Sequence, residues 1–228
     1  GDIRWFNKSY SRAVLGDPLV RTRLGALDIH SYCLHMPIPF FNNRMSFLKR
    51  FAKWMSKNYP DVPVNMSEWT HMQGGRDKGM DSALVTANVM YEDLSVLNVI
   101  SWQHWIAVSE VNFCDGLIYI NLDDKTFEMT KRYYVTGNFS KYVPAGSVRV
   151  DAACDDPELR LLAFKYDGGC AVIVINSTKK EKELSLPEQY SAVKSAVTDD
   201  NNNLREYDIA DPEHIKITPR SVTTIILR

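Results

Sequence analysis

The chain has 228 residues, of which 45% are hydrophobic and 24% charged, and its formal net charge is −1 at pH 7. These values are those of an ordinary globular protein with enough residues for one large domain or two smaller ones. The near-zero net charge gives no electrostatic case for binding nucleic acid or an anionic membrane. No apolar run approaches the roughly 20 residues that a membrane span needs.

The first half of the chain alternates between strand-like and helix-like segments. After a turn at residues 15–18, Asp17 as N-cap and Pro18 as first helical residue predict a helix start. Farther on, apolar residues recur at helical spacing in three longer segments, and short apolar runs bounded by Gly, Pro or polar residues lie between them. We expect helices at residues 18–24, 45–57, 81–97 and 127–142, strands at 25–32, 62–71 and 99–105, and a short apolar run at 116–120.

The last of these helices, at residues 127–142, should face inward with Met129, Tyr133 and Tyr134. It contains Gly137, which weakens a helix by about 1 kcal/mol relative to Ala. A glycine at this position therefore predicts either a close packing contact or a break in the helix.

The pattern changes beyond residues 144–146, where short strand-like runs replace the helical spacing. Turn signals such as Asp167-Gly168-Gly169 separate the runs. We expect strands at residues 148–152, 159–166, 171–176, 181–186, 191–198, 204–207, 215–217 and 222–227. Eight short strands without a helical period predict an antiparallel sandwich or small barrel. The domain boundary should therefore fall near residues 144–148.

Residues 62–71 begin as an apolar run and end in polar residues that include Glu68 and Trp69. A carboxylate beside an indole at the carboxyl end of a parallel strand is how a (β/α) barrel presents catalytic groups and sugar-stacking surfaces. Because alternate residues of a strand face opposite sides, Trp69 reaches a ligand beside Glu68 only if the chain has already turned into the loop. The alternative for Glu68 is a solvated or salt-bridged carboxylate.

The remaining candidate metal ligands are dispersed. Four cysteines occur without a CxxC pair, which argues against a zinc site and leaves their disulfide state open; they are Cys33, Cys114, Cys154 and Cys170. Three pairs of aspartates have the composition of solvated turns and predict no calcium site; they are Asp123-Asp124, Asp155-Asp156 and Asp199-Asp200.

Several ordered motifs together resemble family 30 of the glycoside hydrolases, and most closely its endo-β-1,6-galactanase-like branch. The motifs are residues 30–32, 67–69, 76–84, 101–105, 115–119 and 133–150, and the resemblance runs from about residue 15 to residue 150. In this family the last segment joins a (β/α)₈ barrel to a β-sandwich. The resemblance implies that residues 1–145 are the C-terminal part of a barrel, about three β/α units that correspond to strands six to eight. Residues 146–228 would then form the β-sandwich side domain.

The resemblance implies a retaining glycosidase without a metal or organic cofactor. Its nucleophile would be Glu68, and its acid/base would be a Glu that follows an Asn at the end of the fourth barrel strand. Retaining chemistry requires the two carboxyl groups to lie about 5–5.5 Å apart. The 228 residues contain no Asn-Glu dipeptide, so we expect the acid/base to be absent from them and the isolated chain to be inactive.

The same resemblance and the strand ends indicate which side chains contact the sugar. His30 and Tyr32 share one face of their strand, and Trp105 is favoured over Trp102 as a stacking platform. Trp69 and Arg76, on and after the strand of Glu68, complete the predicted substrate-binding set. The alternatives are core packing for the tryptophans, a buried hydrogen-bonded ring for His30, and a surface role for Arg76.

The predicted function is hydrolysis of a β-linked polysaccharide of the galactan or xylan type, with a carbohydrate as the partner. The resemblance also implies a secreted or periplasmic protein whose leader has been removed. Three open parallel strands have unpaired edges, so we expect self-association or a separate N-terminal barrel half. A non-catalytic carbohydrate-binding or structural remnant of such an enzyme is the other interpretation.

Overall fold

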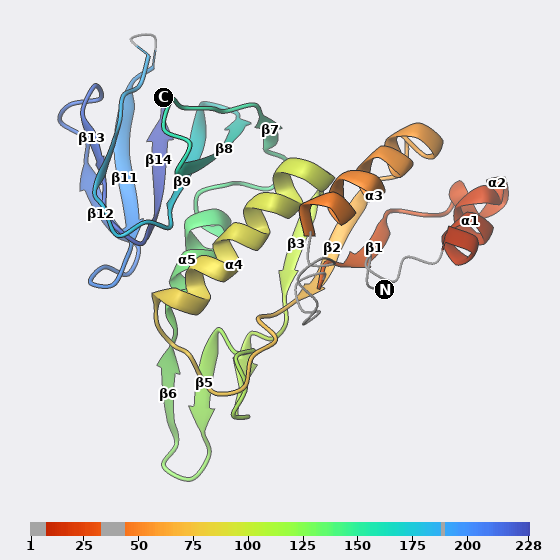
Figure 1. Cartoon of the computed structure of the whole chain (residues 1–228), viewed down its shortest axis with the longest axis horizontal. Helices are drawn as coiled ribbons and strands as arrows, with labels where there is room; N and C mark the ends of the chain where they lie inside the picture. Colours follow the sequence, from red (N-terminus) through yellow and green to blue (C-terminus); the bar gives the residue numbers. More distant parts are fainter. Residues whose placement is uncertain (1–7, 33–43, 188–189) are drawn as a thin grey trace. The chain divides into compact units, whose positions relative to one another are not determined.

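A computed structural model describes residues 8–32, 44–187 and 190–228 of the chain. The described residues form helices, parallel strands and antiparallel strands in one chain (Figure 1). They divide into two compact units. The first unit comprises Gly1–Met72 and Glu92–Ile106, and the second comprises Gln73–Tyr91 and Ala107–Arg228.

The first unit is built on a parallel three-stranded sheet in the order β1-β2-β3. All three strands were predicted, each slightly longer than observed. The bounds of the elements in this unit are α1 Lys8–Gly16, α2 Pro18–Arg21, β1 Leu27–His30, α3 Arg44–Asn58, β2 Val64–Trp69, the π-helical turn η3 Asp93–Leu97, and β3 Ser101–His104.

The helices before residue 100 follow the sequence signals with two corrections. Asp17 caps α2 as predicted, because its side chain accepts hydrogen bonds from the backbone N–H groups of Leu19 and Val20. The predicted turn at residues 15–18 was wrong in its first half, since residues 15 and 16 complete α1, a helix that the sequence analysis missed. The helix expected at residues 81–97 ends at Glu92, and the chain continues as η3.

The helix predicted at residues 45–57 is confirmed as α3, an amphipathic helix. It buries Leu48, Phe51 and Met55, and it packs against η3. Burial of one apolar stripe against the rest of the unit is what makes a helix of this length stable.

The second unit contains two helices and three antiparallel or mixed sheets. Its elements are α4 Met80–Glu92, whose last residue belongs to the first unit, β4 Val108–Ser109, β5 Ile118–Asn121, β6 Thr126–Met129, α5 Lys131–Ser140, β7 Val148–Val150, β8 Leu159–Tyr166, β9 Gly169–Asn176, β10 Lys182–Leu184, β11 Ala192–Thr198, β12 Arg205–Asp208, β13 Ile215–Ile217 and β14 Ser221–Leu227.

The helix predicted at residues 127–142 begins later than expected. Thr130 is its N-cap, with a side chain that accepts from the N–H of Tyr133. Residues 126–129 instead form β6, which pairs antiparallel with β5. The predicted inward face was wrong as well, because Met129 and Tyr133 are exposed while Arg132, Val135, Asn138 and Phe139 are buried.

All eight strands predicted in the second half of the chain are present. Six of them form one sheet in the order β12-β11-β14-β9-β8-β7, and β10 and β13 form a two-stranded sheet. The two sheets share one hydrophobic cluster, to which β8, β9 and β14 contribute from one side and Leu184, Ile215 and Ile217 from the other. This packing is compatible with the β-sandwich that was expected.

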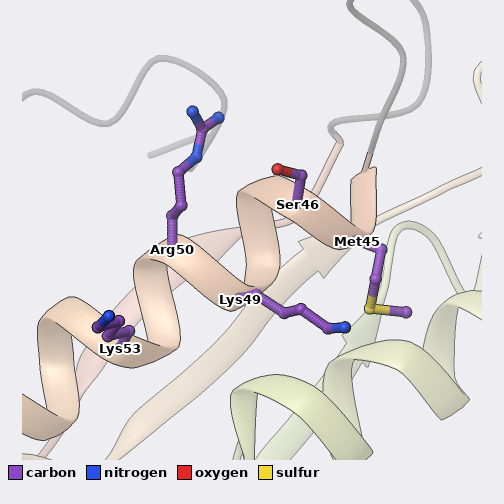
Figure 2. Close-up of a pocket in the computed structure, with 5 residues that line it drawn as sticks. All are labelled: Met45, Ser46, Lys49, Arg50 and Lys53. Carbon is purple, nitrogen blue, oxygen red and sulfur yellow. The ribbon is translucent and has the colours of Figure 1, made fainter.

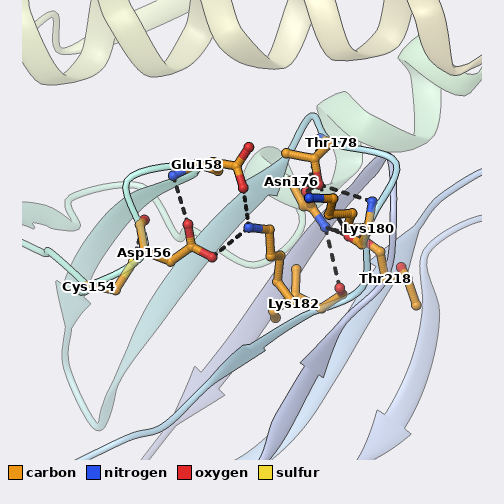
Figure 3. Close-up of polar contacts among 9 residues, drawn as sticks. Cys154, Asp156, Glu158, Asn176, Thr178, Lys180, Lys182 and Thr218 are labelled. Carbon is orange, nitrogen blue, oxygen red and sulfur yellow. Dashed lines mark hydrogen bonds and ion pairs between the residues drawn. The ribbon is translucent and has the colours of Figure 1, made fainter.

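Polar contacts hold the two-stranded sheet at one end of the larger one (Figure 3). Lys182 of β10 forms ion pairs with Asp156, at 2.8 Å, and with Glu158. Asn176, at the end of β9, donates from Nδ2 to the carbonyl oxygens of Lys180 and Thr218, both at 2.9 Å. These contacts lie where β9 ends, opposite the β8–β9 hairpin turn.

Helix α5 packs against β11 and β14 of the six-stranded sheet. The buried Asn138 donates from Nδ2 to the carbonyl oxygen of Ala196, at 2.9 Å, and to Oγ1 of Thr224, at 3.1 Å. Gly137 marks a close packing contact, one of the two predicted outcomes, because an added Cβ would lie 2.5 Å from Cδ1 of Leu204. The predicted domain boundary near residue 145 stays a prediction.

Gly169 provides a test of the backbone packing in the six-stranded sheet. A Cβ at this position would lie 2.7 Å from the carbonyl oxygen of Leu227 and 3.1 Å from the ring of Tyr166. Because backbone cannot yield as a flexible side chain does, Gly169→Ala should lower the free energy of unfolding by about 1–3 kcal/mol. Urea unfolding followed by circular dichroism measures this. The control is Gly25→Ala, whose Cβ would meet nothing within 4 Å, and equal unfolding midpoints for the two variants would contradict the prediction.

Candidate active site

Polar side chains line one face of the parallel sheet in the first unit. Asn65 of β2 donates from Nδ2 to Oδ1 of Asp28 on β1, at 2.9 Å. Its own Oδ1 accepts from the hydroxyl of Ser101 on β3, also at 2.9 Å. These three residues are direct neighbours in the strand registers, so they mark a common face. We call it the polar face of the sheet.

Strand β2 carries one more residue than each of its neighbours. On the β1 side, Ile29 pairs with Met66, but the next residue, His30, pairs with Glu68. The register with β3 shows the same irregularity between Met66 and Trp69. The extra residue is Ser67, so this is a β-bulge.

The bulge decides where the two residues after it point. In a regular strand Glu68 would lie on the face of Met66, opposite Asn65, because side chains alternate. With Ser67 inserted, Glu68 lies on the polar face with Asn65, and Trp69 lies on the apolar face with the buried Met66. A bulge of this kind re-aims a side chain at a functional site.

Glu68 is held by two ring side chains from β1 and the residues after it. The phenolic hydroxyl of Tyr32 donates to Oε1 of Glu68 at 3.0 Å, and Nδ1 of His30 lies 3.5 Å from the same oxygen. The side chains of Glu68 and His30 are about one-third exposed, 30% and 31%. The rings of His30 and Tyr32 meet edge to face with centroids 6.1 Å apart. The structure therefore brings together three of the predicted site residues.

Trp69 does not share this environment. Trp69 was expected to reach a sugar only if the chain had already turned into the loop. The residue still belongs to β2, so this condition is not met. Its side chain is 1% exposed and packs on Trp102 at a centroid distance of 6.0 Å. A buried indole has no face open to a ligand here.

Trp105 and Arg76 lie in different units. Trp105 follows β3 in the first unit and is 51% exposed. Its backbone N–H donates to the carbonyl oxygen of Trp69 at 2.9 Å. Arg76 belongs to the second unit, where it donates to the carbonyl oxygens of Glu110 and Val111 and lies over the ring of Tyr119.

A buried carboxylate beside the strand ends was not predicted. Asp93 of η3 is fully buried and accepts from Oγ of Ser31 at 2.7 Å, from Nε1 of Trp102 at 3.0 Å and from Nη2 of Arg44 at 2.5 Å. Nε of Arg44 also lies 3.1 Å from Glu92. Because Ser31 stands between His30 and Tyr32, this cluster fixes the backbone that carries both rings.

The other features considered in the sequence were metal ligands, cysteines and membrane-spanning helices. In the described part of the chain, no group of three or more His, Cys, Asp or Glu residues is arranged to hold a metal ion. Cys114, Cys154 and Cys170 are free thiols, and Cys33 lies outside the described residues. Over the same residues, no helix has the length and apolarity to cross a bilayer.

The prediction that Asp199 is solvated was wrong. Asp199 is buried, and its carboxylate accepts from the backbone N–H groups of Asn201 and Asn202, both at 2.8 Å, and from Oγ1 of Thr218 at 2.9 Å. Asp123 and Asp124 are exposed, as expected.

A hollow of about 320 Å³ lies on the exposed side of α3, lined by Met45, Ser46, Lys49, Arg50 and Lys53. Its three cationic side chains point in different directions (Figure 2). They do not converge on one point as an anion site would require, and Glu68 is not among the lining residues. This hollow is therefore no part of the candidate active site.

Residues 26–119 match the family model of O-glycosyl hydrolase family 30. The chain resembles the C-terminal part of this family. The mouse lysosomal acid glucosylceramidase is 24% identical over 207 residues, which are 82% of this chain and 37% of that protein.

Two solved structures show the same fold. A conserved exported protein from Bacteroides fragilis has a TM-score of 0.77 and 20% identity, and the match covers 89% of this chain and 46% of that one. A family-30 endoxylanase from Clostridium papyrosolvens has a TM-score of 0.72 and 17% identity, covering 97% and 53% of the two chains. The chain thus spans about a third to a half of the length of these relatives.

The buried Asp93 generates a prediction on pH dependence. Burial raises the pKa of Asp93 from 3.8 to about 6, although Arg44 and the hydrogen-bond donors oppose the shift. Between about pH 4 and pH 6 the folded state therefore binds a proton that the unfolded state has released. The stability that this proton contributes is fully present below about pH 4 and is lost as the pH rises through the folded pKa of about 6.

The test compares Asp93→Asn with the unsubstituted chain by urea unfolding at pH 4, 5, 6 and 7. The difference in unfolding free energy between the two proteins should change by on the order of 1–3 kcal/mol between pH 4 and pH 7, with the change levelling off as the pH passes the folded pKa of about 6. Asp123→Asn, at an exposed position, is the control. A pH-independent difference for Asp93→Asn would show that this carboxyl titrates normally.

Proposed function

We propose that this chain is the C-terminal part of a retaining O-glycosyl hydrolase that acts on a β-linked polysaccharide of the galactan or xylan type. In this proposal β1, β2 and β3 are the last strands of a (β/α)₈ barrel, and the six-stranded and two-stranded sheets of residues 146–228 form the β-sandwich that follows it. The observation that carries the proposal is the position of Glu68. It stands at the carboxyl end of a parallel strand, on the polar face, with Tyr32 and His30 beside it.

Glu68 is the proposed nucleophile. Both of its contacts with described residues are made by Oε1, so Oε2 is the oxygen that would attack the anomeric carbon. Attack forms a glycosyl–enzyme ester and breaks the glycosidic bond, whose oxygen leaves with a proton from the acid/base. Water then hydrolyses the ester, and the product keeps the configuration of the substrate.

The acid/base would have to come from outside these residues. Retention requires a second carboxyl group about 5–5.5 Å from the first, and the sequence has no Asn-Glu dipeptide. Within the described sheet β1 and β3 each have one neighbour only, so both present an edge that further strands could extend. A separate N-terminal barrel half is the proposed source of the acid/base, whereas a second copy of the chain could cover these edges but has no Asn-Glu dipeptide either. The chain alone is expected to be inactive.

The second candidate function is that of a non-catalytic carbohydrate-binding or structural remnant. It is favoured by the absence of the Asn-Glu dipeptide from these residues. For either function we propose a location outside the cytoplasm, because one structural neighbour is described as an exported protein.

The nucleophile assignment is tested by Glu68→Gln in the enzyme assembled with the polypeptide that supplies the first five barrel strands. Hydrolysis of xylan or β-1,6-galactan should fall by about 10³-fold or more, because an amide cannot form the glycosyl ester. Glu110→Gln, at an exposed position, is the control and should keep full activity. Normal turnover by the Glu68→Gln enzyme would refute the assignment.

The role of Tyr32 gives a separate prediction. Removing its hydroxyl in Tyr32→Phe deletes the 3.0 Å bond to Glu68 and should lower kcat of the assembled enzyme by about 10–100-fold, the usual cost of a hydrogen bond to a charged group. Tyr59→Phe is the matched control in the same unit. An unchanged kcat for Tyr32→Phe would mean that this hydroxyl does not position the carboxylate.

A further inference from the structure

The second unit has a hollow of about 860 Å³ at one end of its six-stranded sheet. Its floor is a row of residues that face each other across four strands, namely Val148, Lys165, Cys170 and Leu227. Directly paired residues share a face of a sheet, so these four side chains belong to one surface.

This row continues the face that packs on the two-stranded sheet. The next row inward pairs Ala163 with Val172 and Val172 with Ile225, and these three residues belong to the hydrophobic cluster shared with β10 and β13. The contacts that hold β10 and β13 are made near Asn176 (Figure 3), which is six residues, or about 20 Å, from Cys170 along β9. The β7 and β8 part of the floor is therefore open, since Val148 is 65% exposed and Lys165 is exposed, whereas Leu227 at the other end of the row is buried in the shared cluster.

Aromatic and apolar surfaces line the hollow. Tyr190 is 46% exposed and stands at its edge, and Tyr166 lines it from the end of β8. Val150 is partly exposed next to Val148. Such surfaces pack against the C–H faces of a sugar ring, and a tyrosine offers a hydroxyl as well.

The charges around the hollow balance. Two carboxylates, Asp151 and Asp167, and two cations, Lys165 and Arg228, line it. Among the described residues, Lys165 and Asp167 have no ion pair or side-chain hydrogen bond, so their polar atoms are free for a ligand. A site with equal numbers of both signs favours no ionic ligand, whereas hydroxyl groups can donate to the carboxylates and accept from the cations.

We propose that this hollow is a second, non-catalytic carbohydrate site that binds a neutral oligosaccharide chain. All of its residues lie in the second unit, whereas Glu68 lies in the first. The ligand class rests on the proposed function, but the residues do not, and binding at the hollow requires neither the nucleophile nor an acid/base. The site would hold the enzyme on a polymer that it cleaves elsewhere, or it would serve a remnant as its sole binding surface.

Affinity electrophoresis of the full chain in gels that contain soluble xylan or β-1,6-galactan tests this proposal. At least one polysaccharide should retard the chain. Tyr190→Ala and Lys165→Met should each weaken binding by about fivefold or more, the effect of losing one stacking or hydrogen-bonding contact. Circular dichroism verifies that each variant is folded.

Two exposed positions elsewhere in the same unit provide matched controls, Tyr207→Ala on β12 and Lys216→Met on β13, and both should bind as the unsubstituted chain does. Glu68→Gln should bind normally too, which separates this site from the proposed catalytic one. The proposal is overturned if neither polysaccharide retards the chain, if Tyr190→Ala and Lys165→Met bind unchanged, or if Glu68→Gln abolishes binding.

Discussion

The single inserted residue in β2 is the constraint on which the candidate active site depends. Side chains in a strand alternate between faces, so a carboxylate two residues after a buried Met66 would itself be buried, and burial of an unpaired carboxylate is costly. Ser67 changes this parity. It places Glu68 beside Tyr32 and His30, and it places the indole of Trp69 in the apolar layer with Met66 and Trp102. One register shift thus gives both residues the environments that their chemistry requires.

The same strand shows why the sequence predicted some of this site and missed the rest. The apolar run and its polar end predict a strand near residues 62–71, because both signals are local. The bulge is not a local signal, since it exists only in the registers with β1 and β3. Alternation of side chains alone therefore could not decide which face of the sheet Trp69 lies on. Asp93 was missed for a similar reason. Its partners Ser31, Arg44 and Trp102 are between 9 and 62 residues away.

The second half of the chain was easier to predict because its strands are short, hydrophobic and bounded by Gly or Asp turns, which are local signals. The helix predicted at residues 127–142 was placed wrongly at its start, because no local signal marks the end of the preceding strand. Residues Thr126–Met129 form β6 by pairing with β5, and Thr130, with an extended backbone, is the N-cap of the helix that follows. Helical spacing continued through the boundary, so periodicity could not locate it. The buried Arg132 has no apolar character that a pattern could detect.

Asp93 in the first unit and Lys165 in the second are charged groups in opposite environments. Asp93 is removed from water and is tolerable because Arg44, Ser31 and Trp102 satisfy it, which leaves a raised pKa as the residual cost. Lys165 lies on the same sheet face as the buried Ala163 and Val172, yet no described residue forms an ion pair or a side-chain hydrogen bond with it. A cation on the inner face of a sandwich is unfavourable under a complete second sheet. Its presence therefore requires that end of the face to stay open to water or to a ligand, and β10 and β13 are short enough to leave it so.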